Sequence, residues 1–161
     1  MSYMQRVTKE EYAISEDTLQ IQCVRYFDGL LLKNAFLHHS PNGGARNPKE
    51  GAKFKRMGVR AGYPDLTLLF NGKTVFIELK TEKGYLSFYQ KCFKEWARDN
   101  GFDWYLVRTL NEFIHVLVEL GLVKKGNEWI RPDSRPVGEV RFKNGVGFSN
   151  AHSAFVGEKN E

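Results

Sequence analysis

Residues 63–80 have the sequence YPDLTLLFNGKTVFIELK, which predicts two β-strands joined by a tight turn. Apolar side chains alternate with others along the first arm, and β-branched and aromatic residues fill most of the second. Asn71 and Gly72 lie between the arms. This pair is the strongest short signal for a type I′ turn, because both central residues of such a turn need a positive φ. The stretch therefore predicts an antiparallel hairpin.

The open ends of the two arms carry charged side chains. Residues two apart in a strand point to the same side, so Glu78 and Lys80 share a face. The returning arm can bring Asp65 beside Glu78. A cross-strand ion pair would explain Glu78 and Lys80 alone, but two carboxylates and an ammonium at one edge of an apolar hairpin indicate a functional site.

These charged residues resemble the motif of the PD-(D/E)xK nuclease superfamily, as Pro64-Asp65 followed by Glu78-Leu79-Lys80. Four further segments make the chain similar to the VRR-NUC family of that superfamily, in its stand-alone phage or bacterial type. They are Glu16, residues 41–46 (PNGGAR), residues 58–65 (GVRAGYPD) and residues 87–90 (SFYQ). The resemblance covers residues 15–120. It implies an α/β fold with a restriction-endonuclease-like core, in which helices flank a mixed central β-sheet.

The resemblance also implies a metal-dependent deoxyribonuclease that hydrolyses phosphodiester bonds with Mg²⁺ or Mn²⁺. Asp65, Glu78 and the backbone carbonyl of Leu79 would hold the metal ion, which prefers oxygen ligands and retained waters, and Glu16 would complete the outer shell. Lys80 would either orient or deprotonate the attacking water, or stabilise the transition state. If Lys80 acts as the general base that deprotonates the water, its pKa must be lowered.

Two of these residues also have a purely structural interpretation. Ser87-x-x-Gln90 has the form of a capping box, which explains Gln90 as a helix cap. The resemblance adds a catalytic interpretation, because in the family a Gln here lies near the catalytic Lys80 and the scissile phosphate. Glu16 follows Ser15, a candidate helix cap, so it suits the positive end of the helix dipole as well as a metal site.

Positive charge is unevenly distributed in this chain of net charge +5. Residues 46–60 are rich in Lys and Arg and contain Glu50 as their acidic residue. Such clustering favours a polyanionic partner, although charged runs also occur as solvated surface. We expect this segment to be partly helical at best. The predicted DNA-binding residues are Asn42, Gly43, Gly44, Arg46, Lys53, Lys55, Arg56 and Arg60.

Periodicity and capping residues outline the rest of the core. They predict helices after Ser15, Ser87 and Thr109, and strands at residues 35–40 and 104–108. In the helix after Ser87, the apolar stripe is formed by Phe88, Cys92, Phe93 and Trp96.

The length of 161 residues indicates one domain. We divide the chain into an N-terminal segment (1–14), a nuclease-like domain (15–123) and a C-terminal extension (124–161). The extension is expected to form a small hairpin around residues 143–145 and otherwise to be loosely ordered or to form an interface. Its apolar residues either fold back on the domain or contribute to a homodimer. They are Phe142, Val146, Phe148 and Phe155.

The sequence contains no apolar run of membrane-spanning length and no signal-peptide pattern at its start. Cys23 and Cys92 are isolated, which favours reduced thiols. We therefore expect a cytoplasmic protein without a membrane partner, in the bacterial host cytoplasm if a phage encodes it.

Stand-alone VRR-NUC proteins imply a structure-selective endonuclease that acts as a homodimer on branched DNA, such as four-way (Holliday) junctions. Duplex DNA is the other expected partner. Two alternatives remain: a non-catalytic nucleic-acid-binding domain with a nuclease fold, and a sequence-specific restriction-type endonuclease. The complete set Asp65, Glu78 and Lys80 argues against the first. The lack of an obvious specificity domain argues against the second.

Overall fold

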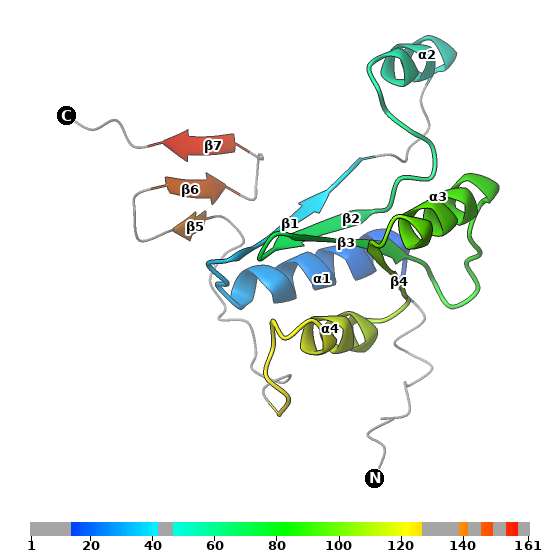
Figure 1. Ribbon diagram of the computed structural model, residues 1–161. Helices are drawn as coiled ribbons and strands as arrows, with labels where there is room; N and C mark the ends of the chain where they lie inside the picture. Colours follow the sequence, from blue (N-terminus) through cyan, green and yellow to red (C-terminus); the bar gives the residue numbers. More distant parts are fainter. Residues whose placement is uncertain (1–13, 42–46, 127–138, 142–145, 150–153, 158–161) are drawn as a thin grey trace.

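The computed structural model describes residues 14–41, 47–126, 139–141, 146–149 and 154–157 (Figure 1). Its main body is a four-stranded sheet with four helices. The strands are β1 (Ala35–His39), β2 (Leu66–Phe70), β3 (Lys73–Leu79) and β4 (Asp103–Val107), and the helices are α1 (Glu16–Gly29), α2 (Pro48–Arg56), α3 (Phe88–Asp99) and α4 (Leu110–Glu119). The strand order is β1-β2-β3-β4. The first two pairings are antiparallel and the β3–β4 pairing is parallel, so the predicted mixed α/β sheet is confirmed.

The hairpin at the centre of the sheet follows the sequence prediction. Asn71 and Gly72 have φ values of 47° and 75°, the positive values that the turn requires. Leu66 pairs with Ile77, so the next residue outward on each arm brings Asp65 to Glu78. The charged end of the hairpin therefore lies at the edge of the sheet, away from the turn.

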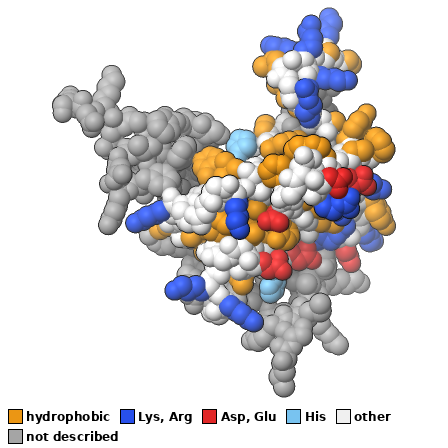
Figure 2. All heavy atoms as spheres, viewed as in Figure 1, with side chains coloured by type: hydrophobic (Ala, Val, Ile, Leu, Met, Phe, Trp, Pro, Cys, Tyr) orange, Lys and Arg blue, Asp and Glu red, His pale blue; other side chains and the backbone are white. Residues whose placement is uncertain are grey.

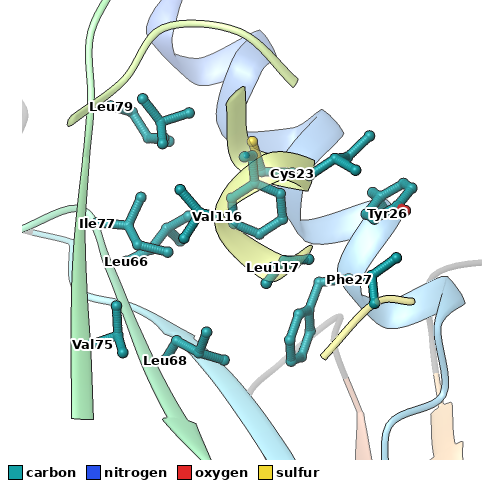
Figure 3. Packing of buried hydrophobic residues seen from close by; sticks show 14 of the residues in the cluster. Cys23, Tyr26, Phe27, Leu66, Leu68, Val75, Ile77, Leu79, Val116 and Leu117 are labelled. Carbon is teal, nitrogen blue, oxygen red and sulfur yellow. The ribbon is translucent and has the colours of Figure 1, made fainter. Parts of the chain in front are cut away.

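One face of the sheet packs against α1 and α4, and this contact forms the hydrophobic core (Figure 3). Alternate residues of the hairpin point into it because side chains alternate between the two faces of a strand. The sheet contributes Leu66, Leu68, Val75, Ile77 and Leu79, and the helices contribute Leu19, Cys23, Tyr26, Phe27, Phe113, Val116 and Leu117. The core fixes the register of β2 and β3, since a slip of one residue would turn these side chains to the other face.

Helix α2 is more regular than predicted. The Asn47 side chain accepts a hydrogen bond from the Glu50 N–H at 2.9 Å, and Pro48 occupies the first helical position. None of the described residues of α2 is buried, so apolar periodicity gave no signal for it. The local capping residues alone account for its start, and they would have predicted the helix.

Helix α3 lies on the opposite face of the sheet from the core, and most of its apolar stripe is exposed. Phe88 is 73% exposed and Trp96 is 49% exposed, and Cys92 is also exposed. Phe93 alone of the four packs on the sheet, with its ring 5.0 Å from that of Phe76. The reason is that nothing described lies on the outer side of α3. The residue of α3 that is buried is Ala97.

The C-terminal extension contains a separate antiparallel sheet of β5 (Glu139–Arg141), β6 (Val146–Ser149) and β7 (Ala154–Gly157). The predicted hairpin between its first two strands is confirmed. Strand β7 was not predicted. Phe142 lies outside the described residues. Among the described helices, none is long and apolar enough to cross a membrane.

Candidate active site

Asp65 is held at the open end of the hairpin by its neighbours in two strands. The Leu79 N–H donates a hydrogen bond to Asp65 Oδ2 at 2.9 Å. The Asp65 backbone carbonyl accepts from the Ser40 N–H at 3.2 Å and lies 2.9 Å from His39 Nδ1. These contacts fix the Asp65 carboxylate beside the end of β3, next to Glu78.

Glu78 and Lys80 form a buried ion pair. The Glu78 side chain is fully buried, and Lys80 Nζ lies 2.8 Å from Glu78 Oε1. Lys80 Nζ also donates to the Leu79 carbonyl at 2.9 Å, and the Gln90 Nε2 group donates to the same Glu78 Oε1. Glu78 Oε2 is buried without a hydrogen-bond partner among the described residues.

No described residue satisfies the second oxygen of Glu78. Leaving a buried acceptor unsatisfied costs about 1–3 kcal/mol, and more when the group is charged. Native structures contain few such groups, and each calls for an explanation such as stored strain, a bound water or ion, or a catalytic role. Glu78 Oε2 is therefore the clearest mark of a functional site in the described chain.

The pKa values of the pair reflect burial and mutual attraction. Burial raises the pKa of Glu78 to about 7, and the hydrogen bond from Lys80 opposes this rise. Burial acts to lower the pKa of Lys80, but the hydrogen bond and charge of Glu78 outweigh it and hold the Lys80 pKa above its ordinary value. In this state Lys80 is a protonated ammonium, which suits charge stabilisation and does not suit proton abstraction.

Glu16 is brought to the same place by α1. The Ser15 side chain caps the helix by accepting from the Thr18 N–H at 3.1 Å, as predicted. Glu16 then lies in the first turn, and its Oε2 is 3.5 Å from Lys80 Nζ. Both interpretations of Glu16 are compatible with this geometry, since the residue lies at the helix N-terminus and also borders the site.

The Gln90 side chain forms the predicted helix cap and also reaches the candidate site. Its Oε1 accepts from the Ser87 N–H at 2.8 Å, and its own N–H donates to Ser87 Oγ at 3.3 Å, which completes the capping box. With Oε1 used in the cap, Nε2 points to Glu78. The direct contact is thus with Glu78, where the resemblance implied Lys80. A Cβ added at Gly62 (φ 82°) would collide with the backbone of Tyr89 and Gln90, so Gly62 allows the chain before Asp65 to pack on this turn.

The chain was compared with known proteins. No family model and no curated protein matches it. A solved structure named VRR_NUC domain protein matches with a TM-score of 0.52 and 29% sequence identity, over 66% of this chain and 88% of that chain. The fold is VRR-NUC-like. This agrees with the family that the sequence resembles and gives the chain a nuclease-type α/β domain.

The VRR-NUC-like domain contains a contact that the sequence did not reveal. The Arg108 guanidinium, at the end of β4, donates to the backbone carbonyls of Thr81 and Glu82, the second at 3.2 Å. A Cβ added at Gly84 would lie 3.1 Å from Lys80 Cδ, so this loop covers the Lys80 side chain. Arg108 therefore anchors the loop over the site. The sequence contains no direct signal for this contact. It depends on the parallel pairing of β3 and β4, which places the ends of both strands at one edge of the sheet.

The predicted DNA-binding residues are partly described. Lys53, Lys55, Arg56 and Arg60 are exposed, and the first three lie on α2. Helix α2 stands out from the sheet, and Figure 2 shows Lys and Arg side chains gathered around it. The other four, Asn42, Gly43, Gly44 and Arg46, lie outside the described residues. The VRR-NUC-like domain thus presents a positively charged helix, α2, which precedes β2 in the sequence.

Proposed function

We propose that this chain is a metal-dependent endonuclease that hydrolyses phosphodiester bonds in DNA. The observation that carries the proposal is the buried, unpartnered Oε2 of Glu78, next to Asp65 and Lys80 in a VRR-NUC-like fold. A structural ion pair would leave no reason for a second buried carboxylate oxygen without a partner. A nuclease-type fold with this arrangement favours phosphate chemistry.

The residues of the site fit a hard divalent cation, Mg²⁺ or Mn²⁺. The donors are all oxygen atoms: the carboxylates of Asp65 and Glu78 and the Leu79 carbonyl, with Glu16 further out. No group of three His, Cys, Asp or Glu side chains gathers into a metal cluster in the described part of the chain. The oxygen donors of Asp65 and Glu78 suit Mg²⁺, which commonly binds one or two carboxylates and keeps several waters. Such a cation would neutralise phosphate charge and make a bound water more acidic.

The remaining residues position Glu78 and Lys80 or stabilise negative charge on the phosphate. Gln90 holds Glu78 Oε1, and Oε2 stays without a hydrogen-bond partner among the described residues. Lys80 supplies a fixed positive charge for the negative charge that develops on the phosphate, and its raised pKa supports this role over that of a general base. Arg108 keeps the loop of Gly84 closed over Lys80, which limits water access to the ammonium.

We further propose that the substrate is branched DNA, four-way junctions included, and that the active form is a homodimer in the cytoplasm. One site in one small domain cuts one strand, and a two-fold dimer presents two sites to a junction of matching symmetry. The resemblance to stand-alone VRR-NUC proteins supports this. Light scattering on the full chain and on a chain ending at Lys125 tests it. A dimer that becomes a monomer without the extension assigns the contact to the extension, and a monomer in both refutes the dimer.

A cleavage assay tests the nuclease proposal. The full chain is incubated with labelled four-way junction, flap, duplex and single-stranded DNA in Mg²⁺, in Mn²⁺ and in excess EDTA. We expect cleavage in either metal, none in EDTA, and the fastest cleavage on branched DNA. Binding without cleavage in every metal would instead favour the non-catalytic alternative. Cleavage at one short sequence regardless of DNA structure would favour the restriction-type alternative.

A further inference from the structure

Three exposed aromatic side chains lie around the first turn of α3. Tyr85 is 89% exposed, Phe88 is 73% exposed and Tyr89 is 60% exposed. The rings of Phe88 and Tyr89 meet edge to face, with 5.7 Å between their centroids. We call these three residues the aromatic patch. Large apolar side chains that form a contiguous patch on the surface often mark an interaction site.

The aromatic patch adjoins the candidate active site at both of its ends. Tyr89 directly precedes Gln90, whose amide contacts Glu78. Tyr85 directly follows Gly84, which lies against the Lys80 side chain. The backbone that carries the aromatic patch is therefore joined to the site at Gly84 and at Gln90.

Lysines flank the aromatic patch. Lys83, Lys91 and Lys94 are all exposed, and they are the charged residues between Glu82 and Glu95. Arg60 and the basic helix α2 belong to the segment that leads through Gly62, which packs on the backbone of Tyr89. A surface of aromatic rings between lysines is complementary to a single nucleic-acid strand, which offers flat bases and a negative backbone.

We propose that the aromatic patch stacks on unpaired bases next to the scissile phosphate, so that the preferred substrates contain unpaired nucleotides, as in forks, flaps and gaps. This rests on the proposed nuclease function and, among branched DNA substrates, ranks those with unpaired nucleotides above the fully paired four-way junction. Aromatic side chains stack on any base that is free of its neighbours, and the lysines hold the flanking phosphates. Bases within a duplex are already stacked on both sides and offer no face to Tyr85 or Phe88.

The test is equilibrium binding measured in EDTA, where no cleavage occurs. The probes are a fluorescein-labelled fork with two unpaired arms and a blunt duplex of equal length. Tyr85→Ala combined with Phe88→Ala should weaken fork binding at least about five-fold and change duplex binding less than about two-fold. The aromatic-preserving pair Tyr85→Phe and Phe88→Tyr should keep the fork affinity. Phe36→Ala, a partly exposed aromatic on β1, is the control and should have no effect.

Three results would overturn the proposal. They are an unchanged fork affinity, an equal loss on fork and duplex, and a change of oligomeric state in the double variant, which would make the patch a protein interface. The melting temperature should stay that of the wild type, because Tyr85 and Phe88 are largely exposed. The nuclease proposal and the stacking proposal can be refuted independently of each other. A protein that binds forks through the patch and cuts nothing refutes the nuclease alone, and one that cuts DNA but binds without the patch refutes the stacking alone.

Discussion

The two ends of the β2–β3 hairpin follow different physical rules. At the turn end, Asn71 and Gly72 adopt positive φ values that Asn and Gly tolerate well, and the adjacent Lys73 is exposed to solvent. At the open end, Glu78 and Lys80 are buried, and one Glu78 oxygen has no partner among the described residues. The turn end favours folding, whereas the open end opposes it.

This difference separates residues that build the fold from residues that serve a function. A turn of this type lowers the free energy of the hairpin through local conformation alone. Burying a carboxylate costs several kcal/mol unless it is fully paired, and a well-packed apolar residue would often be as stable. The open end therefore keeps its charges for a purpose other than stability, and substitutions at the two ends should have opposite consequences.

The largest effect is expected from Glu78→Gln, which should reduce cleavage by about 10²-fold or more through loss of a metal ligand. It should also abolish the stabilisation that Mg²⁺ or Mn²⁺ gives the wild type, which is seen as a rise in melting temperature. At a hundred-fold excess of metal over Kd this stabilisation adds about 2.7 kcal/mol to the free energy of unfolding. Glu95→Gln, an exposed glutamate on α3, is the matched control. An unchanged metal-dependent shift in Glu78→Gln would place the metal elsewhere.

A smaller effect is expected from Arg108→Ala, which removes the anchor of the loop over Lys80. We expect kcat to fall about ten-fold, with little change in KM or in DNA affinity, because the loop positions Lys80 and does not itself hold the substrate. Arg98→Ala, an exposed arginine on α3, is the control. Equal losses in kcat and in the free energy of unfolding would make Arg108 a structural residue only.

A third effect concerns the basic helix. Replacing Lys53 and Lys55 by Gln should weaken binding to every DNA probe by a similar factor. It should also reduce the slope of log affinity against log salt concentration by about 0.9 for each phosphate that the protein no longer neutralises. The measurement is a salt titration of fluorescence anisotropy. An unchanged slope would show that α2 only solvates the surface.

The smallest effect on activity is expected at the turn end. Gly72→Ala places a side chain at a φ of 75° and should cost about 1 kcal/mol of folding stability, measured by denaturant unfolding. Cleavage at 25 °C should stay within about two-fold of the wild type, since most molecules remain folded. A large loss of cleavage in folded Gly72→Ala would contradict the division between the two ends.

The sequence predicted the features that depend on interactions between residues close together in the chain. The hairpin, the caps at Ser15 and Ser87 and the meeting of Asp65 with Glu78 all follow from turn chemistry, capping residues and strand alternation. It did not predict the exposure of Phe88 and Trp96, because periodicity shows that a helix has an apolar side but not whether anything covers it. Arg108 was also missed, since its contact depends on the pairing of two strands distant in sequence.

The central claim is that the open end of the hairpin cleaves DNA, and Lys80→Ala tests it most directly. The measurement is cleavage of a labelled four-way junction in Mg²⁺, beside the binding of the same junction in EDTA, with Lys73→Ala at the turn end as the control. We expect Lys80→Ala to lose cleavage by at least about 10²-fold and to keep its DNA affinity, because Lys80 contributes mainly to the transition state. Cleavage at the wild-type rate in Lys80→Ala would contradict the account.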